Sequence, residues 1–207
     1  MKKLVLLFAT AILLTITSTS QAQDEKCFNE GTSAINLGVG VVNTLSYNNG
    51  YIGGYAYGGG AAFTPAFTAS YEYGIKHVGI GIIGAGLEFG FQGTHYNYAG
   101  TPYRERWTTL AFSPRATYHF DFLNKKKLDI YAIVQLNVYA NSYSDNSPYY
   151  TNSNGTFTTY SSHSVGVRPG VMVAIRYFFT PNFGVFSELG YDICVIKGGL
   201  SFKFGGK

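Results

Sequence analysis

Charged residues are scarce in this chain of 207 residues. Asp, Glu, Lys and Arg make up 13% of it, about half of the roughly 25% that soluble domains carry. A chain so poor in charge covers a water-facing surface badly. The formal net charge of +4 forms no basic stripe, and the one dense basic run, residues 125–127, reads as a solvated turn. The composition therefore disfavours a soluble domain and gives no basis for a nucleic-acid partner.

Long apolar runs are absent except at the N-terminus. There, Lys2 and Lys3 precede an apolar stretch from Leu4 to Ile16, with small residues before Ala22. The stretch is shorter than the roughly 20 residues that a membrane-spanning helix needs. Residues 1–22 are therefore predicted to be a signal peptide cleaved after Ala22. A retained membrane anchor is the alternative, and the sequence before Cys27 does not fit a lipoprotein.

Proline is rare, with six residues, whereas 26 glycines and an aromatic content of 17% are high. The aromatics are 18 Tyr, 16 Phe and one Trp. This combination is typical of a β-barrel whose outer surface meets lipid and whose rims are aromatic.

Apolar and small or polar residues alternate with a period of two through most of the chain, which indicates strands with two different faces. The clearest case is 108–122, where Leu110, Phe112 and Tyr118 alternate with polar neighbours. A change of phase near Ile82 and Ile83 predicts a bulge there. The predicted strands are 33–42, 62–73, 78–92, 108–122, 128–140, 163–178, 183–192 and 196–204.

The predicted connections alternate in length. Long ones, rich in Tyr, Asn, Ser and Gly, are expected at 43–60, 93–107 and 141–162, and tight turns at 74–77, 121–127 and 180–182. Long loops at one end and short turns at the other are the layout of outer-membrane barrels. The last connection, near Cys194, departs from this layout because it is short.

The two cysteines, Cys27 and Cys194, could pair in an exported protein. The strand order places them at opposite ends of the barrel. We therefore expect no disulfide, and two unpaired thiols that serve as packing residues.

Alternation alone does not say which face is outside, and a soluble lipocalin-like barrel would hide the apolar face. Three features favour the inverted arrangement: a sparse charge content, a second face that is small and ionisable, and aromatics near the strand ends of the apolar face. The ionisable residues expected to pair inside the lumen are Glu72, Glu88, Arg115, Arg168, Arg176, Glu188 and Lys203. The aromatic girdles are expected at Tyr71, Tyr73, Tyr118, Phe120 and Tyr177 at the turn end, and at Trp107, Tyr139 and Tyr191 at the loop end.

The signal segment, the strand pattern and turn-flanking runs such as 114–120 and 183–191 resemble the small outer-membrane β-barrel family that includes the OmpA and OmpX types. The resemblance implies an all-β, eight-stranded antiparallel up-and-down transmembrane barrel in a Gram-negative-type outer membrane. Leu200, Phe202 and Phe204 resemble the C-terminal signal that the barrel assembly machinery reads in this family. The resemblance therefore also implies insertion by that machinery. The expected organisation is a signal peptide (1–22), a short periplasmic segment (23–30), the barrel (31–204) and a C-terminal tail (205–207).

The motifs associated with chemistry are weak in this sequence. Residues 79–84 match the dinucleotide-binding pattern of glycines, but no helix is predicted after them, as that site requires. The four histidines, His77, His95, His119 and His163, lack metal-ligand spacing. Ser162 and Ser164 flank His163, yet neighbours on a strand point to opposite faces and make no catalytic pair. We therefore expect no enzyme activity, no cofactor and no metal.

Two functions of the lumen charges remain open: a narrow conduction path and a packed ion network that closes the barrel. Eight strands leave an interior just wide enough for side chains, which favours the closed barrel. The leading expectation is a non-enzymatic, monomeric protein with a structural role or an extracellular partner bound by its loops. A small-solute channel, a lipid A-modifying enzyme and a soluble lipocalin-like binder are the alternatives.

Overall fold

A computed structural model describes residues 26–44, 59–147 and 158–206. The predicted signal peptide and the central parts of the loops 43–60 and 141–162 lie outside these residues. Within the described ranges, no helix has the length and apolar character needed to cross a membrane.

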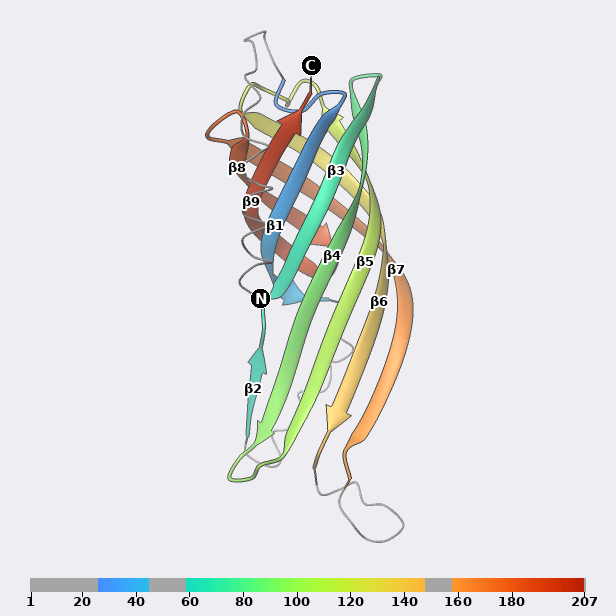
Figure 1. The fold of residues 1–207 in the computed structure, drawn as a ribbon, viewed down its shortest axis with the longest axis vertical. Coiled ribbons are helices and arrows are strands. Elements are labelled where there is room, and N and C mark those ends of the chain that lie inside the picture. Colours follow the sequence, from blue (N-terminus) through green and yellow to red (C-terminus); the bar gives the residue numbers. More distant parts are fainter. Residues whose placement is uncertain (1–25, 45–58, 148–157, 207) are drawn as a thin grey trace, which may run out of the picture.

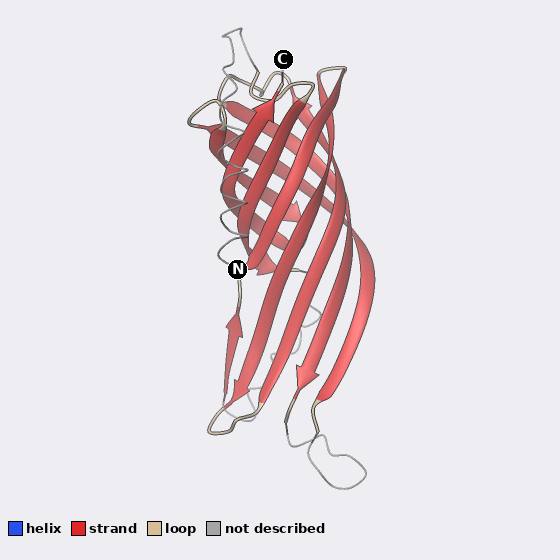
Figure 2. Cartoon of the chain, viewed as in Figure 1, coloured by secondary structure: helices blue, strands red, loops and turns tan. Residues whose placement is uncertain are grey.

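The described chain forms one antiparallel sheet that closes on itself (Figures 1 and 2). Neighbouring strands pair in chain order, β4 pairs with β5, and β9 returns to pair with β1. The strands are β1 (Thr32–Asn43), β2 (Gly59–Phe63), β3 (Ala66–Val78), β4 (Gly81–Tyr98), β5 (Arg104–Phe120), β6 (Leu128–Asp145), β7 (Tyr160–Phe178), β8 (Phe183–Tyr191) and β9 (Cys194–Gly205).

The segments β2 and β3 occupy one position in the barrel wall. Both pair with β4, through Phe63 with Thr94 and Phe67 with Phe91. Pro65 lies between them, and a proline has no N–H to donate to a neighbouring strand. The barrel therefore has eight positions, and the predicted eight-stranded antiparallel up-and-down fold is confirmed.

The turn between β3 and β4 lies later than the sequence indicated. β3 continues to Val78, and the turn is made at Gly79, whose φ of +64° suits glycine. The register shift lies in β3, between Gly74 and Lys76. The predicted turn at 74–77 and the predicted bulge near Ile82 and Ile83 are therefore wrong. Gly74 resembled a turn residue, but a Cβ there would lie 2.3 Å from the carbonyl oxygen of Asn29.

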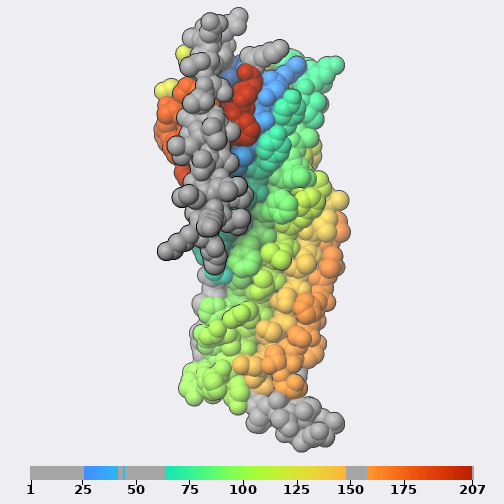
Figure 3. All heavy atoms as spheres, in the orientation of Figure 1, coloured from blue at the N-terminus to red at the C-terminus, as the bar shows by residue number. Residues whose placement is uncertain are grey.

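Much of the predicted loop 93–107 is strand, because β4 and β5 continue to Tyr98 and from Arg104. β6 and β7 are also longer than predicted. The strands β4 to β7 have 17 to 19 residues, whereas β1, β8 and β9 have 9 to 12. The long strands form a wall that runs past the rest of the barrel (Figures 1 and 3). We call residues 93–98, 104–108, 141–145 and 160–164 the projecting wall.

Burial alternates along the strands with the polarity reversed from that of a soluble protein. In β7, Met172, Ala174 and Arg176 are buried, while Val171 and Val173 are 60% and 59% exposed. The same pattern places charged residues inside and large apolar residues outside in the other strands of the closed part. The barrel thus has a polar interior and an apolar outer belt.

The aromatic residues of this outer face follow the prediction at the turn end and, at the loop end, at Tyr191, which is exposed on the outside. Tyr71, Tyr73 and Tyr177 are exposed on the outside. Trp107 and Tyr139 instead share the inward phase of their strands, so the predicted girdle is wrong at these two positions. Tyr139 lies over Gly166, where an added Cβ would be 2.4 Å from the Tyr139 hydroxyl.

Candidate functional site in the barrel lumen

Four charged residues meet in the lumen near the short turns: Glu72, His119, Asp129 and Arg176, from β3, β5, β6 and β7. Arg176 donates to Asp129 at 3.1 Å and to Glu72 at 2.8 Å. His119 contacts the same two carboxylates, with Nδ1 2.9 Å from Asp129. Each side chain is at most 2% exposed. In this turn-end cluster two carboxylates face one guanidinium and one imidazole, so each acid has two partners.

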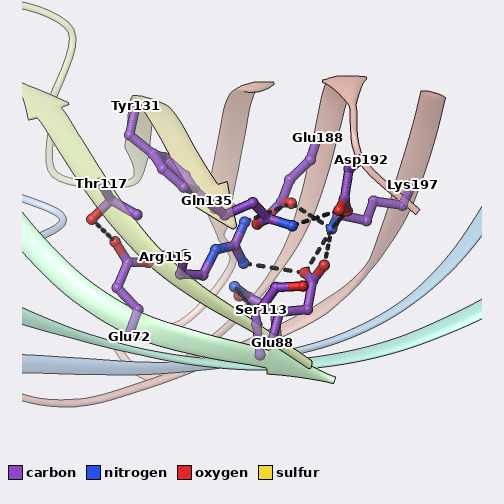
Figure 4. A network of polar contacts seen from close by, with 12 residues as sticks. Glu72, Glu88, Ser113, Arg115, Thr117, Tyr131, Gln135, Glu188, Asp192 and Lys197 are labelled. Atoms are coloured by element: carbon purple, nitrogen blue, oxygen red, sulfur yellow. Dashed lines mark hydrogen bonds and ion pairs between the residues drawn. The ribbon is translucent and has the colours of Figure 1, made fainter. Parts of the chain in front are cut away.

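A second cluster lies nearer the middle of the barrel and contains Glu88, Arg115, Glu188, Asp192 and Lys197 (Figure 4). Lys197 contacts all three carboxylates, at 2.6 Å from Glu88 and 3.0 Å from Glu188. Arg115 pairs with Glu88 at 3.2 Å and with Glu188 at 3.0 Å. This central cluster has three carboxylates and two cations.

Among the described residues, both clusters leave buried polar atoms without a hydrogen-bond partner, and in the turn-end cluster this atom is Nε of Arg176. Within the described residues, Oε1 of Glu188 and Nε of Arg115 have no hydrogen-bond partner. The neighbouring amides are in the same state, since Oε1 of Gln135 and Nδ2 of Asn137 also lack one there. Buried polar groups are usually paired. In the described chain, the middle of the lumen therefore has more unpartnered polar atoms than the turn end.

The chain preceding β1 closes the turn end of the lumen. Phe28 stacks on His119 with ring centroids 3.8 Å apart, and His119 stacks on Tyr131 at 4.7 Å. The Phe28 backbone donates to Asn124 Oδ1 and accepts from Asn124 Nδ2, and Lys203 donates to the Cys27 carbonyl at 2.8 Å. Cys27 and Phe28 are each 1% exposed. The segment expected as a short periplasmic piece, 23–30, thus enters the barrel over its described residues.

Lys26 anchors this segment at the turn end of the barrel by contacting Asp121, in the turn before β6, and Asp121 also contacts His77 of β3. Lys26 lies 2.7 Å from Asp121, and His77 contacts the other carboxylate oxygen. Burial would raise the pKa of Asp121, but the hydrogen bonds from Lys26 and His77 outweigh it and hold this pKa below its ordinary value. We call Lys26–Gly31 the N-terminal plug.

Five of the seven ionisable residues expected in the lumen lie in the two clusters: Glu72, Glu88, Arg115, Arg176 and Glu188. The other two lie elsewhere.

Arg168 donates to the carbonyl oxygens of Thr44 and Asp192, and its guanidinium lies 4.2 Å from the Tyr191 ring. Lys203 binds the plug and lies 5.0 Å from the Phe178 ring.

The predicted set of paired lumen charges lacked four cluster members: Asp129, Asp192, Lys197 and His119, although the alternation of its strand does predict that His119 faces the lumen. All four lie at inward-facing positions of strands predicted from the sequence. Lys197, for example, faces the same side of its strand as Ser201 and Lys203. Extending each alternation to every residue of its strand could have found them.

The residues of the predicted assembly signal lie on β9, which pairs with β1 through Leu200 with Leu37 and Phe204 with Ser33. Leu200 is exposed on the outer face, and the rings of Phe202 and Phe183 are 5.4 Å apart. Their role in assembly stays a prediction.

The other motifs form no catalytic or metal site among the described residues. The glycines of 79–84 lie in the turn and the first residues of β4. His163 shares the outward phase of Val165, whereas Asp145 faces inward and accepts from Ser147 and Tyr143. Nowhere in the described ranges do three His, Cys, Asp or Glu residues gather as metal ligands.

The two cysteines are buried and free, at opposite ends of the barrel. Burial raises the pKa of the Cys27 thiol to about 12. Cys194 packs against the backbone of β1, where a Cβ on Gly40 would lie 2.1 Å from its sulfur. Both positions are consistent with thiols that fill space.

Comparisons with known proteins identify structures but no sequence relatives. No protein-family model and no curated protein sequence matches the chain. Ail, the attachment invasion locus protein of Yersinia pestis, aligns in complex with sucrose octasulfate at 11% identity and a TM-score of 0.47, over 85% of this chain and 96% of Ail. The N-terminal β-barrel domain of OprF from Pseudomonas aeruginosa aligns at 14% identity and a TM-score of 0.40, over 86% of this chain and 100% of the domain. The fold described here rests on the strand pairing of this chain itself.

Proposed function

We propose that this protein is a non-enzymatic, monomeric outer-membrane β-barrel with a closed lumen, whose projecting wall and loops form its interaction surface. The observation that carries the proposal is the reversed polarity of the barrel. Charged side chains lie inside in paired clusters, and large apolar side chains cover the outside. A soluble lipocalin-like barrel would have the opposite arrangement.

The height of the apolar belt supports a membrane location. On β5 the outward apolar residues run from Leu110 to Phe120. Ten residues of antiparallel strand rise about 34 Å, which at a tilt of about 40° corresponds to about 26 Å along the barrel axis. This matches the apolar band of about 25 Å on outer-membrane barrels.

The contents of the lumen support a closed barrel rather than a channel. The central cluster and the turn-end cluster occupy successive levels along the barrel axis. At the turn end, Phe28 of the N-terminal plug stacks on His119. An eight-stranded barrel has little further interior space.

Two features support an absence of catalysis. The carboxylates of the projecting wall, Glu105 and Asp145, face inward and His163 outward, so neither forms an acid–base pair with His163. The buried acids of the clusters are held by cations and are at most 3% exposed.

The proposal is tested by expressing the full chain in a Gram-negative host and analysing the outer-membrane fraction by SDS–PAGE with and without boiling. A closed barrel is expected in that fraction, with a band that shifts on heating. A soluble periplasmic protein without a shift would overturn the membrane location. In planar bilayers the purified protein is expected to give no conductance steps, and regular steps would favour the small-solute channel instead.

A further inference from the structure

The outer faces of β4 to β7 carry aligned rows of residues, which the strand pairing sets. The loop end of the barrel, which is the lower end in Figure 1, is taken here as its top. The uppermost apolar row then consists of Phe91, Leu110, Ala140 and Val165, paired in that order across the four strands. Leu110 and Val165 are 58% and 76% exposed. This row marks the upper edge of the apolar belt.

Apart from Gly93, the next rows on the same face consist of polar and basic residues. The first holds Gly93, Thr108, Ser142 and His163, and the second holds His95, Arg106, Ser144 and Ser161. Arg104 follows on β5 and donates to Asn97 at 2.8 Å. Each row lies about 7 Å along the strand from the one below it. We call Arg104, Arg106, His95 and His163 the basic rim.

No carboxylate of the described chain offsets the basic rim on this face. Glu105 and Asp145, the acids of the projecting wall, have the inward phase, and Glu105 accepts a hydrogen bond from Tyr98. The adjoining segments 45–58 and 148–157 contain no Asp or Glu. The outer face of the wall is therefore positively charged just above the apolar belt.

A hollow of about 530 Å³ lies directly below the basic rim on the outside of the barrel. Its size is within the range of about 300–1,000 Å³ for small-molecule sites. Phe89, Phe91, Leu110, Phe112 and Val165 contribute to its apolar lining. Phe91, Leu110, Ala140 and Val165 form its upper part and are also the row next to the polar rim.

We propose that this face binds one anionic, phosphate-bearing lipid, with an acyl chain in the hollow and the phosphate on Arg106 and Arg104. This inference rests on the proposed function, because it places the hollow within the hydrocarbon layer. Arginine presents several N–H donors in a fixed fork that matches phosphate oxygens. The charge of the rim and the apolar lining of the hollow fit the two ends of one such molecule.

The test uses the full-length barrel reconstituted in vesicles of equal parts phosphatidylglycerol and phosphatidylcholine. After extraction in detergent, retained lipid is counted by native mass spectrometry. The wild type is expected to retain phosphatidylglycerol in preference to phosphatidylcholine. The double variant R104Q/R106Q is expected to lose this preference by at least about fivefold, whereas Lys126→Gln at the opposite end changes it by less than about twofold.

A second variant, Ala140→Trp, fills the hollow from the outer face without touching the lumen. It is expected to reduce the retention of both lipids, and retention at the wild-type level would overturn the role of the hollow. An unchanged lipid preference in R104Q/R106Q would overturn the role of the rim. Failure of the wild type to enter vesicles would instead overturn the proposed membrane location, and the heat shift on SDS–PAGE verifies that each variant is folded.

Discussion

The two charged clusters of the lumen differ in how completely they are paired. The turn-end cluster balances Glu72 and Asp129 against Arg176 and His119, and the stacked ring of Phe28 covers it. The central cluster has one carboxylate more than it has cations, and two of its polar atoms lack partners in the described chain, against one at the turn end, Nε of Arg176. The turn end of the lumen is thus sealed by the plug over a cluster with as many cations as carboxylates, while the middle has one carboxylate in excess. Substitutions that remove one charge should affect the two regions differently.

The largest effect is expected for Lys197→Met, which removes the one cation shared by three carboxylates. Removing one partner of a buried ion pair typically costs about 3–5 kcal/mol. Arg176→Met should cost less, because His119 still contacts both acids of its cluster. Urea unfolding of the barrel in detergent micelles measures both changes.

The matched control for these variants is Lys126→Met in the exposed turn, with an expected change within about 0.5 kcal/mol. If Lys197→Met were no more destabilising than this control, the central cluster would contribute nothing to stability.

A sharper comparison replaces one acid in each cluster by its amide. Both oxygens of Glu72 accept hydrogen bonds, from Thr117, His119 and Arg176, so Glu72→Gln must turn its NH₂ toward a donor. This should cost about 1–3 kcal/mol.

Glu188 uses only Oε2, so the NH₂ of Glu188→Gln can take the place of Oε1. Its cost should be about 1 kcal/mol or less. The same urea titration decides the order, and a larger loss for Glu188→Gln would contradict the proposed difference.

The seal itself is tested through Cys27, which lies beside Phe28. Its buried thiol, with a pKa of about 12, should react very slowly with a maleimide near neutral pH. Phe28→Ala removes the stack on His119 and should speed labelling by at least about tenfold through local opening of the plug.

Labelled Cys27 is distinguished from Cys194 by peptide mass spectrometry. The control is Phe122→Ala, since Phe122 is 59% exposed on the outside of the adjacent turn. Equal labelling rates in both variants would show that Phe28 does not hold the plug.

The smallest effect is expected from a change of pH that protonates Asp121 at the turn end of the barrel. Because Asp121 has a lowered pKa in the folded state, its bonds to Lys26 and His77 contribute fully above the ordinary Asp pKa of about 4. The contribution disappears as the pH falls through the lowered value. Pepsin cleavage next to Phe28 should therefore accelerate in strong acid, by less than about threefold. Asp121→Asn should remove this acceleration, and a persistent one would assign it to other groups.

The sequence predicted the closed part of the barrel well because its two faces differ in polarity. In β5 the alternation from Leu110 to Phe120 is uninterrupted, and the predicted end of the turn before Leu128 agrees with the structure. The projecting wall was taken for loop because both of its faces contain polar residues, which removes the period-two contrast.

The site was predicted in part for a similar reason. The inward phase of Glu72 and Arg176 follows from the sequence, but which charges meet depends on the stagger between strands that are distant in the chain. Gly74 shows the same limit of prediction from sequence. A glycine is needed there because the backbone of Asn29 lies close to it, and Asn29 is distant from Gly74 in the chain.

The pairing of β1 with β9 has a consequence for how the chain acquires its structure. Thr32 pairs with Gly205 and Asn43 with Cys194, so the first strand finds one of its two partners only in the last. Contacts between the extreme ends of a chain make folding slow, and partly made sheets have reactive edges. Strand β9 must therefore be synthesised before the ring can close, and until then the unpaired edge of β1 needs protection from other chains.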